Sequence, residues 1–155
     1  MRRKDREVTD RNEITDIFRD ADACRIAFAV DSEPYIVCMN YVYCWESDLP
    51  VLYFHCAHEG LKLRMMQRND RVCFQLDASH RLRYDEAAVY CTMDYSSIVG
   101  YGVLEKVEDS GEIKKGLDLL MEHHGHTAPE SYPASSMARV TVLRLKVTEL
   151  TAKKK

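Results

Sequence analysis

The chain has 155 residues, of which 46% are hydrophobic, and its formal net charge of −3 comes from 22 basic and 25 acidic residues. This length and apolar content predict a single domain over residues 1–155 with a packed core, and they exclude a globally disordered chain. The near balance of charge argues against a nucleic-acid-binding protein, which would carry a basic excess or stripe.

In chain order, the first predicted element is an amphipathic helix that begins after Asp10. Asp10 and Glu13 have the spacing of a capping box, and apolar residues then repeat with helical period at 14, 17, 18 and 21. Strands are predicted next at 23–30, 35–45 and 51–55, with polar turns at 31–34 and 46–50. Asn40 is the one polar interruption in the second of these strands.

The second half of the chain continues with elements at residues 61–68 (short helix), 72–77 (strand), 79–86 (polar loop), 89–107 (long strand), 109–123 (amphipathic helix), 125–136 (loop) and 139–150 (strand). Gly100 and Gly102 indicate a bend or bulge in the long strand, and a phase slip at Val142 and Leu143 indicates another. Residues 1–8 and 151–155 are predicted to be flexible tails. Because short turns join most strands, the pattern favours a mainly β fold, an antiparallel sheet closed into a barrel with flanking helices, over a βαβ fold.

The chain contains neither an apolar run of the roughly 18 to 20 residues that a membrane span needs nor an N-terminal apolar signal. Its six cysteines form no C-x-x-C pair, and most of them lie in apolar, strand-like runs. Buried free thiols in a reducing compartment fit this usage better than a disulfide framework does. The sequence therefore predicts a cytoplasmic protein without a membrane partner.

Polar residues gather where the strand at 51–55 meets the helix at 61–68: His55, Cys56, His58, Glu59 and Gly60. The first N–H groups of a helix have no intrahelical partners, and together with the helix dipole they favour an anion. Gly60 allows close backbone approach to a ligand, and Lys62 supplies a positive charge that would suit a phosphate monoester. The alternative is an ordinary strand-to-helix connection with a surface lysine.

Metal binding and nucleophilic catalysis find less support in the sequence. The spacing of His55, Cys56 and His58 is not a usual zinc pattern, and the histidines at 123, 124 and 126 lie at a helix end, where they interact favourably with its carbonyl groups. Adjacent strand residues point to opposite faces, so Cys56 and His55 do not predict an activated thiol. Neither a metal site nor a catalytic side chain is predicted.

Five segments give the chain a family resemblance: MRRKDREVTD, PYIVCMNYVY, LYFHCAHEGLKL, NDRVCFQLD and YSSIVGYGVLEKVED. In this order and spacing they resemble the 5-nitroimidazole-resistance (Nim-type) proteins of the pyridoxamine 5′-phosphate oxidase-like FMN-binding split-barrel superfamily. The resemblance extends from about Met1 to Lys153. It implies an antiparallel split β-barrel that forms a homodimer, with FMN held in two clefts between the subunits.

The resemblance also implies which residues bind the cofactor. The expected contacts are Cys38, Met39, Asn40 and Tyr41 along the isoalloxazine ring, largely through backbone groups; His55, Cys56, Ala57, Gly60, Leu61 and Lys62 around the phosphate, with Arg64 as a weaker candidate; and Tyr95, Ser96 and Ser97 from across the dimer interface. Cys56 stands where relatives commonly have Ser or Thr, and Leu61 stands where they often have His or a basic residue.

Three functions are compatible with these features. The first is an FMN-dependent oxidoreductase that reduces a small organic acceptor, such as a nitroimidazole or another nitro compound. The second is a binding or storage protein that holds FMN, a deazaflavin or haem without turnover. The third is a barrel whose ligand site has decayed, for which Cys56 and Leu61 are the relevant departures.

Overall fold

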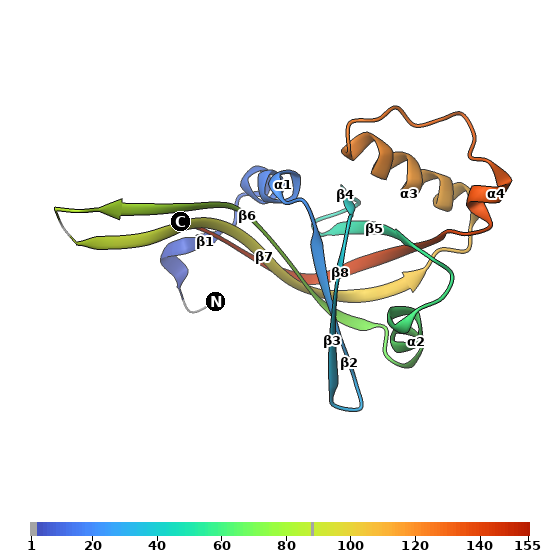
Figure 1. Cartoon of the computed structure of the whole chain (residues 1–155), viewed down its shortest axis with the longest axis horizontal. Helices are drawn as coiled ribbons and strands as arrows, with labels where there is room; N and C mark the ends of the chain where they lie inside the picture. The colour runs from blue at the N-terminus through green and yellow to red at the C-terminus, as the bar shows by residue number, and fades with distance from the viewer. Residues whose placement is uncertain (1–2, 88) are drawn as a thin grey trace.

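Eight antiparallel strands form one sheet in the computed structural model, which describes residues 3–87 and 89–155 (Figure 1). The strands are β1 (Glu7–Val8), β2 (Cys24–Val30), β3 (Glu33–Met39), β4 (Val42–Trp45), β5 (Pro50–Cys56), β6 (Arg71–Asp85), β7 (Tyr90–Lys106) and β8 (Thr141–Lys154). Hydrogen-bonded neighbours follow the order β3-β2-β6-β7-β8-β5-β4, and β1 pairs with β8. The predicted mainly β, antiparallel fold is confirmed, but no ladder among the described residues joins β3 to β4, so the sheet is not closed.

The two edge strands of this sheet are consecutive in the chain. Only Asn40 and Tyr41 separate β3 from β4, and we call this link, with the open edges on either side of it, the seam. The prediction of one strand over 35–45 was therefore wrong. The chain leaves β3 because Tyr41 is fully buried and donates its hydroxyl to the carbonyl oxygen of Phe18 at 2.6 Å. The following residues pair with β5 instead of β2.

Helices flank the sheet: a 3-10 turn at Lys4–Arg6, α1 (Arg11–Asp20), α2 (Leu61–Arg68), α3 (Ser110–His123) and α4 (Ala134–Met137). The predicted cap of α1 is confirmed, because the Asp10 carboxylate accepts hydrogen bonds from the backbone N–H groups of Asn12 and Glu13. Asp109 caps α3 in the same way. No helix in the described part of the chain is long and apolar enough to cross a bilayer.

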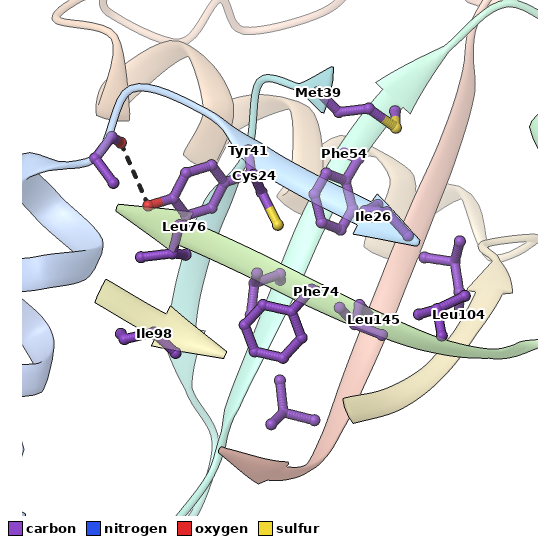
Figure 2. Close-up of a cluster of buried hydrophobic side chains, with 14 of the residues drawn as sticks. Cys24, Ile26, Met39, Tyr41, Phe54, Phe74, Leu76, Ile98, Leu104 and Leu145 are labelled. Atoms are coloured by element: carbon purple, nitrogen blue, oxygen red, sulfur yellow. Dashed lines mark hydrogen bonds between the residues drawn. The ribbon is translucent and has the colours of Figure 1, made fainter. Parts of the chain in front are cut away.

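Two apolar clusters hold the fold together. The larger one is a cluster of buried side chains that includes Tyr41, Phe54, Phe74 and Leu145 (Figure 2). The smaller one packs the opposite face of β5 and β8 against α3. This second layer explains the phase slip of the last strand: Val142 faces α3 and Leu143 faces the main core, so both are buried without a bulge.

The ladder between β7 and β8 is irregular at Gly102, as the glycines of the long strand indicated, whereas other parts of the register differ from the prediction. The extra residue of β8 is Thr148, opposite the bond between Tyr101 and Gly102, and the predicted bulge at 142–143 is absent from the described ladders. Residues 79–85, predicted as a loop, belong to β6, which resumes pairing with β7 after an irregularity at Ser79, where φ is +61°. They form a two-stranded ribbon that projects from the body of the sheet (Figure 1), and its polar residues reflect exposure on both faces.

The predicted tails also require correction. Residues 151–154 continue β8, and Ala152 is 1% exposed because it packs between its ladder partners Val8 and Ile98. Residues 7 and 8 form β1 on the other edge of β8, whereas residues 1 and 2 lie outside the described residues. Neither segment shows a clear apolar alternation, so the sequence carried no strand signal there. Both are held in the sheet by pairing between β8 and its neighbours β1 and β7.

We expect Tyr41→Phe to lower the free energy of unfolding by about 1–2 kcal/mol, since it leaves the buried carbonyl oxygen of Phe18 without its hydroxyl donor. Urea unfolding followed by circular dichroism measures this change. Tyr43→Phe is the matched control, because the half-buried Tyr43 hydroxyl donates only a long, 3.4 Å bond to the carbonyl oxygen of Thr15. Equal losses in the two variants would contradict the anchoring role of Tyr41.

Candidate functional site

A cavity of about 300 Å³ lies at the seam, and we call it the seam cavity. It collects the ends of β3 and β5, the residues after them and the first turn of α2. Its lining residues are Val37, Cys38, Met39, Asn40, His55, Cys56, Ala57 and Lys62. All of these except Val37 were predicted from the sequence or the family resemblance, and the apolar Val37 carries no local signal that would have singled it out.

The two strands present different groups to the seam cavity. β3 pairs only with β2, so the backbone N–H and C=O groups along its other edge are not used by a ladder within the described sheet. Those groups are available to a ligand beside Cys38 and Asn40. β5, in contrast, is paired on both sides along most of its length and brings His55 and Cys56 to the cavity at its end.

The start of α2 has the features of an anion site. Its N-cap, Gly60, has φ +146°, a backbone conformation that L side chains rarely adopt. No described side chain caps this helix, so its first N–H groups remain available to a ligand. Lys62 lies in the first turn, is half-buried, lines the cavity and has no carboxylate partner among the described residues. Gly60 does not itself line the cavity, but positive charge and free donors occur together in the first turn of α2, next to it.

Cys56 lies beside this lysine but is not an activated thiol. Burial raises the pKa of the Cys56 thiol, and the nearby Lys62 ammonium opposes this only in part. The sulfur therefore stays protonated near neutral pH and can act as a weak hydrogen-bond donor. Within the described residues, no three His, Cys, Asp or Glu side chains are grouped to hold a metal ion.

His58 has a structural role in the loop between β5 and α2. Its Nε2 lies 2.6 Å from the carbonyl oxygen of Ala138, and its Nδ1 lies 2.8 Å from the hydroxyl oxygen of Thr141. A carbonyl only accepts hydrogen bonds, so Nε2 carries a proton. These two bonds tie the loop to the start of β8 and hold the first turn of α2 in place.

Two predicted cofactor contacts place their side chains elsewhere. The Leu61 side chain is 45% exposed and lines a different pocket, next to Pro34 and Arg68 on the far side of α2. The Tyr41 side chain points into the core. Only the backbone groups of these two residues can contribute to the seam cavity. Arg64 is exposed and does not line it.

Tyr95, Ser96 and Ser97 lie on β7 and do not line the seam cavity of their own chain. The Tyr95 hydroxyl accepts a 3.3 Å bond from Arg6, and Ser96 donates to the carbonyl oxygen of Ala78 at 3.3 Å. Ser97 is only 7% exposed, and its hydroxyl has no hydrogen-bond partner among the described residues. Such an orphaned group indicates a missing partner.

Ser97 lies on the face of the sheet opposite the main core, which we call the outer face and which carries both apolar and charged side chains. Strand alternation places Ile36 and Cys38 of β3 on this face, together with Val99 and Tyr101 of β7. Ile36 is 66% exposed and Tyr101 is 47% exposed. Cys38 also lines the seam cavity, so the cavity opens beside the outer face.

Comparison with known proteins gives three kinds of result. A family model described as pyridoxamine 5′-phosphate oxidase matches residues 10–154. A search of curated proteins gave no significant match. Among solved structures, a candidate 5-nitroimidazole antibiotic resistance protein from Bacteroides thetaiotaomicron is 32% identical, with a TM-score of 0.81 over 96% of this chain and 86% of that one. This similarity confirms the resemblance predicted from the sequence.

More distant structures share the fold. An FAD- and haem-binding protein from Mycobacterium smegmatis is 16% identical, with a TM-score of 0.78 over 97% of this chain and 73% of its own. An FAD-binding protein from Mesorhizobium loti is 21% identical, with a TM-score of 0.67 over 97% of each chain. At these identities the likeness concerns the architecture alone.

Proposed function

The chain belongs to the pyridoxamine 5′-phosphate oxidase family, and we propose that it is a homodimeric flavoprotein that binds FMN and reduces a small organic acceptor. The observation that carries this proposal is the seam cavity. It combines an uncapped helix N-terminus, an unpaired lysine and an open strand edge within one site. A phosphate with a flat, hydrogen-bonding ring attached to it matches this combination.

The phosphate fits the wall made by α2. The backbone N–H groups after Gly60 and the Lys62 ammonium would neutralise its charge, which is about −1.5 to −2 near neutral pH. Cys56 provides only a weak donor where relatives have a hydroxyl, so the helix terminus and the lysine carry most of the interaction. The site therefore remains suited to a phosphate despite the two departures at Cys56 and Leu61.

The ring fits the wall made by β3. Unpaired backbone groups beside Cys38, Met39 and Asn40 can hydrogen-bond the polar edge of an isoalloxazine, while Val37 and Met39 offer apolar contact. Bound flavin would supply the redox chemistry, accepting and donating electrons. The residues of this chain would hold the ring, orient it at the seam and limit its contact with water. We assign no side chain as an acid or base.

A homodimer formed through the outer face would complete the site. This face exposes Ile36, Val99 and Tyr101 around a charged pair, and exposed apolar side chains that share one face are typical of an interaction site. Because Cys38 belongs to both the outer face and the cavity, a partner packed here would cover the flavin. The Ser97 hydroxyl would then find a hydrogen-bond partner in the other subunit or in the bound FMN. Sedimentation equilibrium tests this: a monomer at micromolar concentration would contradict the proposal.

A binding protein without turnover is the second candidate, and the fold it shares with the FAD- and haem-binding protein from Mycobacterium smegmatis favours keeping it. The visible absorption spectrum of the purified protein, before and after FMN is added and excess removed, tests cofactor retention. Turnover with reduced nicotinamide and nitro acceptors then separates the two functions. Retained flavin without turnover supports the binding protein, whereas failure to retain FMN contradicts the flavoenzyme and leaves only a binding protein for a deazaflavin or haem.

Ser97→Ala tests the role of the orphaned hydroxyl. Among the described residues of its own chain this hydroxyl has no hydrogen-bond partner, so its removal should leave the free energy of unfolding unchanged or slightly higher. If the hydroxyl bonds FMN or the partner subunit, FMN affinity or dimer affinity should fall about 3- to 10-fold, the effect of one neutral hydrogen bond.

Ser96→Ala is the matched control for this experiment, since it removes the bond to the Ala78 carbonyl and should cost about 1 kcal/mol of stability. Fluorescence titration with FMN, sedimentation and urea unfolding measure the three quantities. A Ser97 variant that retains both affinities in full removes this residue from the site.

A further inference from the structure

A second cavity, of about 240 Å³, lies on the other side of the seam residues, and we call it the α3 cavity. Helix α3, the segment after it, α4 and the start of β8 enclose it. Its walls are mostly apolar: Leu117, Leu120, Met121, Met137 and Val140. Methionine side chains adapt to flat aromatic ligands and make favourable sulfur–aromatic contacts.

The α3 cavity adjoins the seam cavity. Asn40 and His55 line both of them, one from the link between β3 and β4 and the other from the end of β5. These two side chains therefore form a shared wall. A compound in the α3 cavity would lie next to whatever occupies the seam cavity, with one layer of protein between the two.

The α3 cavity is held open by polar contacts at its rim. Tyr132 donates its hydroxyl to Asp118 of α3 at 2.9 Å, and Lys114 bonds both Asp118 and the carbonyl oxygen of Pro129. Burial and this carboxylate raise the pKa of Tyr132 to about 12, so the phenol stays protonated and the bond persists at neutral pH. His58 fixes the end of α4 through the Ala138 carbonyl. A preformed site of this kind loses little ordering entropy on binding.

We propose that the α3 cavity binds a neutral, planar aromatic compound of about two fused rings with a hydrogen-bonding atom at its edge. An apolar cavity of about 150 Å³ accommodates benzene, so a volume of 240 Å³ suits a bicyclic ring. Polar groups that can pair with its edge come from His124, Tyr132 and Ser136. Neither Lys, Arg, Asp nor Glu occurs among the described lining residues, which favours an uncharged ligand.

Quinoline is the probe that tests the proposal, with binding to the purified protein measured by isothermal titration calorimetry. Saturable binding of one quinoline per chain is the expected result. The anion 2-naphthoate, of similar shape, should bind at least about tenfold more weakly because its carboxylate would lose hydration without gaining a cation. Absence of saturable quinoline binding, or equal affinity for the two probes, overturns the proposal.

Ser136→Phe locates the binding site, because a phenyl group at this half-buried position of α4 would fill the cavity. It should weaken quinoline binding at least about tenfold. Ser135→Phe, at the exposed neighbouring position outside the lining, should leave the affinity within about twofold. Equal affinity in both variants contradicts the assigned site. Should circular dichroism show that Ser136→Phe is unfolded, the smaller Ser136→Leu serves the same comparison.

This inference extends the proposed function, yet its test is separate from it. Quinoline binding is measured as heat, without flavin reduction, whereas FMN retention is read from the visible spectrum. A protein that retains FMN but does not bind quinoline would reject only the α3 cavity as a ligand site. A protein that binds quinoline but does not retain FMN would reject the proposed flavoprotein and keep the α3 cavity as a site for an aromatic ligand.

Discussion

Lys62→Ala should weaken FMN binding about 10- to 100-fold, which corresponds to the roughly 1.5–3 kcal/mol that a hydrogen bond to a charged group contributes. Lys62 is the one cation that lines the described seam cavity, and it has no carboxylate partner there to share its charge. The loss should shrink as salt concentration rises, because screening weakens the attraction that the substitution removes. Quenching of FMN fluorescence during titration measures the affinity.

Arg64→Ala is the matched control, since Arg64 lies two residues further along the same helix but is exposed and outside the cavity. It should change FMN affinity by less than about twofold and fold as well as the Lys62 variant does. If both variants bind FMN as tightly as the unmodified protein does, Lys62 does not hold the phosphate. If both lose affinity to the same extent, the effect is one of overall helix charge.

Gly102→Ala should be the most destabilising of the single substitutions considered, at about 3 kcal/mol, or about 6 to 12 °C in melting temperature. A Cβ at this position would overlap the backbone carbonyl of Lys146 and lie 2.8 Å from Leu145 Cδ1. The carbonyl belongs to the ladder between β7 and β8 next to the bulge, so it cannot rotate away as a side chain would. Thermal unfolding measures the effect.

Gly111→Ala controls for the substitution itself. Gly111 lies in the first turn of α3, where a Cβ would lie 3.2 Å from the capping carboxylate of Asp109, the end of a side chain and not fixed backbone. Alanine also favours the helix by up to about 1 kcal/mol, so the two effects nearly offset each other. A Gly102 variant as stable as the Gly111 variant would show that β8 shifts freely at the bulge.

Local chemistry made much of the seam cavity predictable from sequence. The geometry here follows from the termini of two successive elements. β5 ends at Cys56, α2 begins after Gly60, and Lys62 lies in the first turn of that helix. The cap at Asp10 was predictable for the same reason. The contribution of β3 came from the family resemblance, because nothing local indicates that residues 38–40 lie beside residue 56.

Long-range pairing explains what sequence patterns could not predict. The run 35–45 is apolar except for Asn40, and its division at Tyr41 depends on a carbonyl group from α1 that periodicity cannot reveal. Residues 79–85 are polar like a loop, yet they pair with β7 in an exposed ribbon. The apolar stripe of α3 predicts a core-facing helix, whereas some of its residues line a cavity. Leu61 follows Gly60 directly, but helical rotation turns its side chain away.

The seam affects where the sheet can open locally. Separating any other neighbouring pair of the described strands would break a ladder of hydrogen bonds, whereas β3 and β4 are joined only through the backbone of Asn40 and Tyr41. Widening the gap between them breaks no ladder of the described sheet, so a local opening there loses no strand-pairing hydrogen bond. A flat molecule can then enter edge-on during a local fluctuation, and its exchange is decoupled from global unfolding.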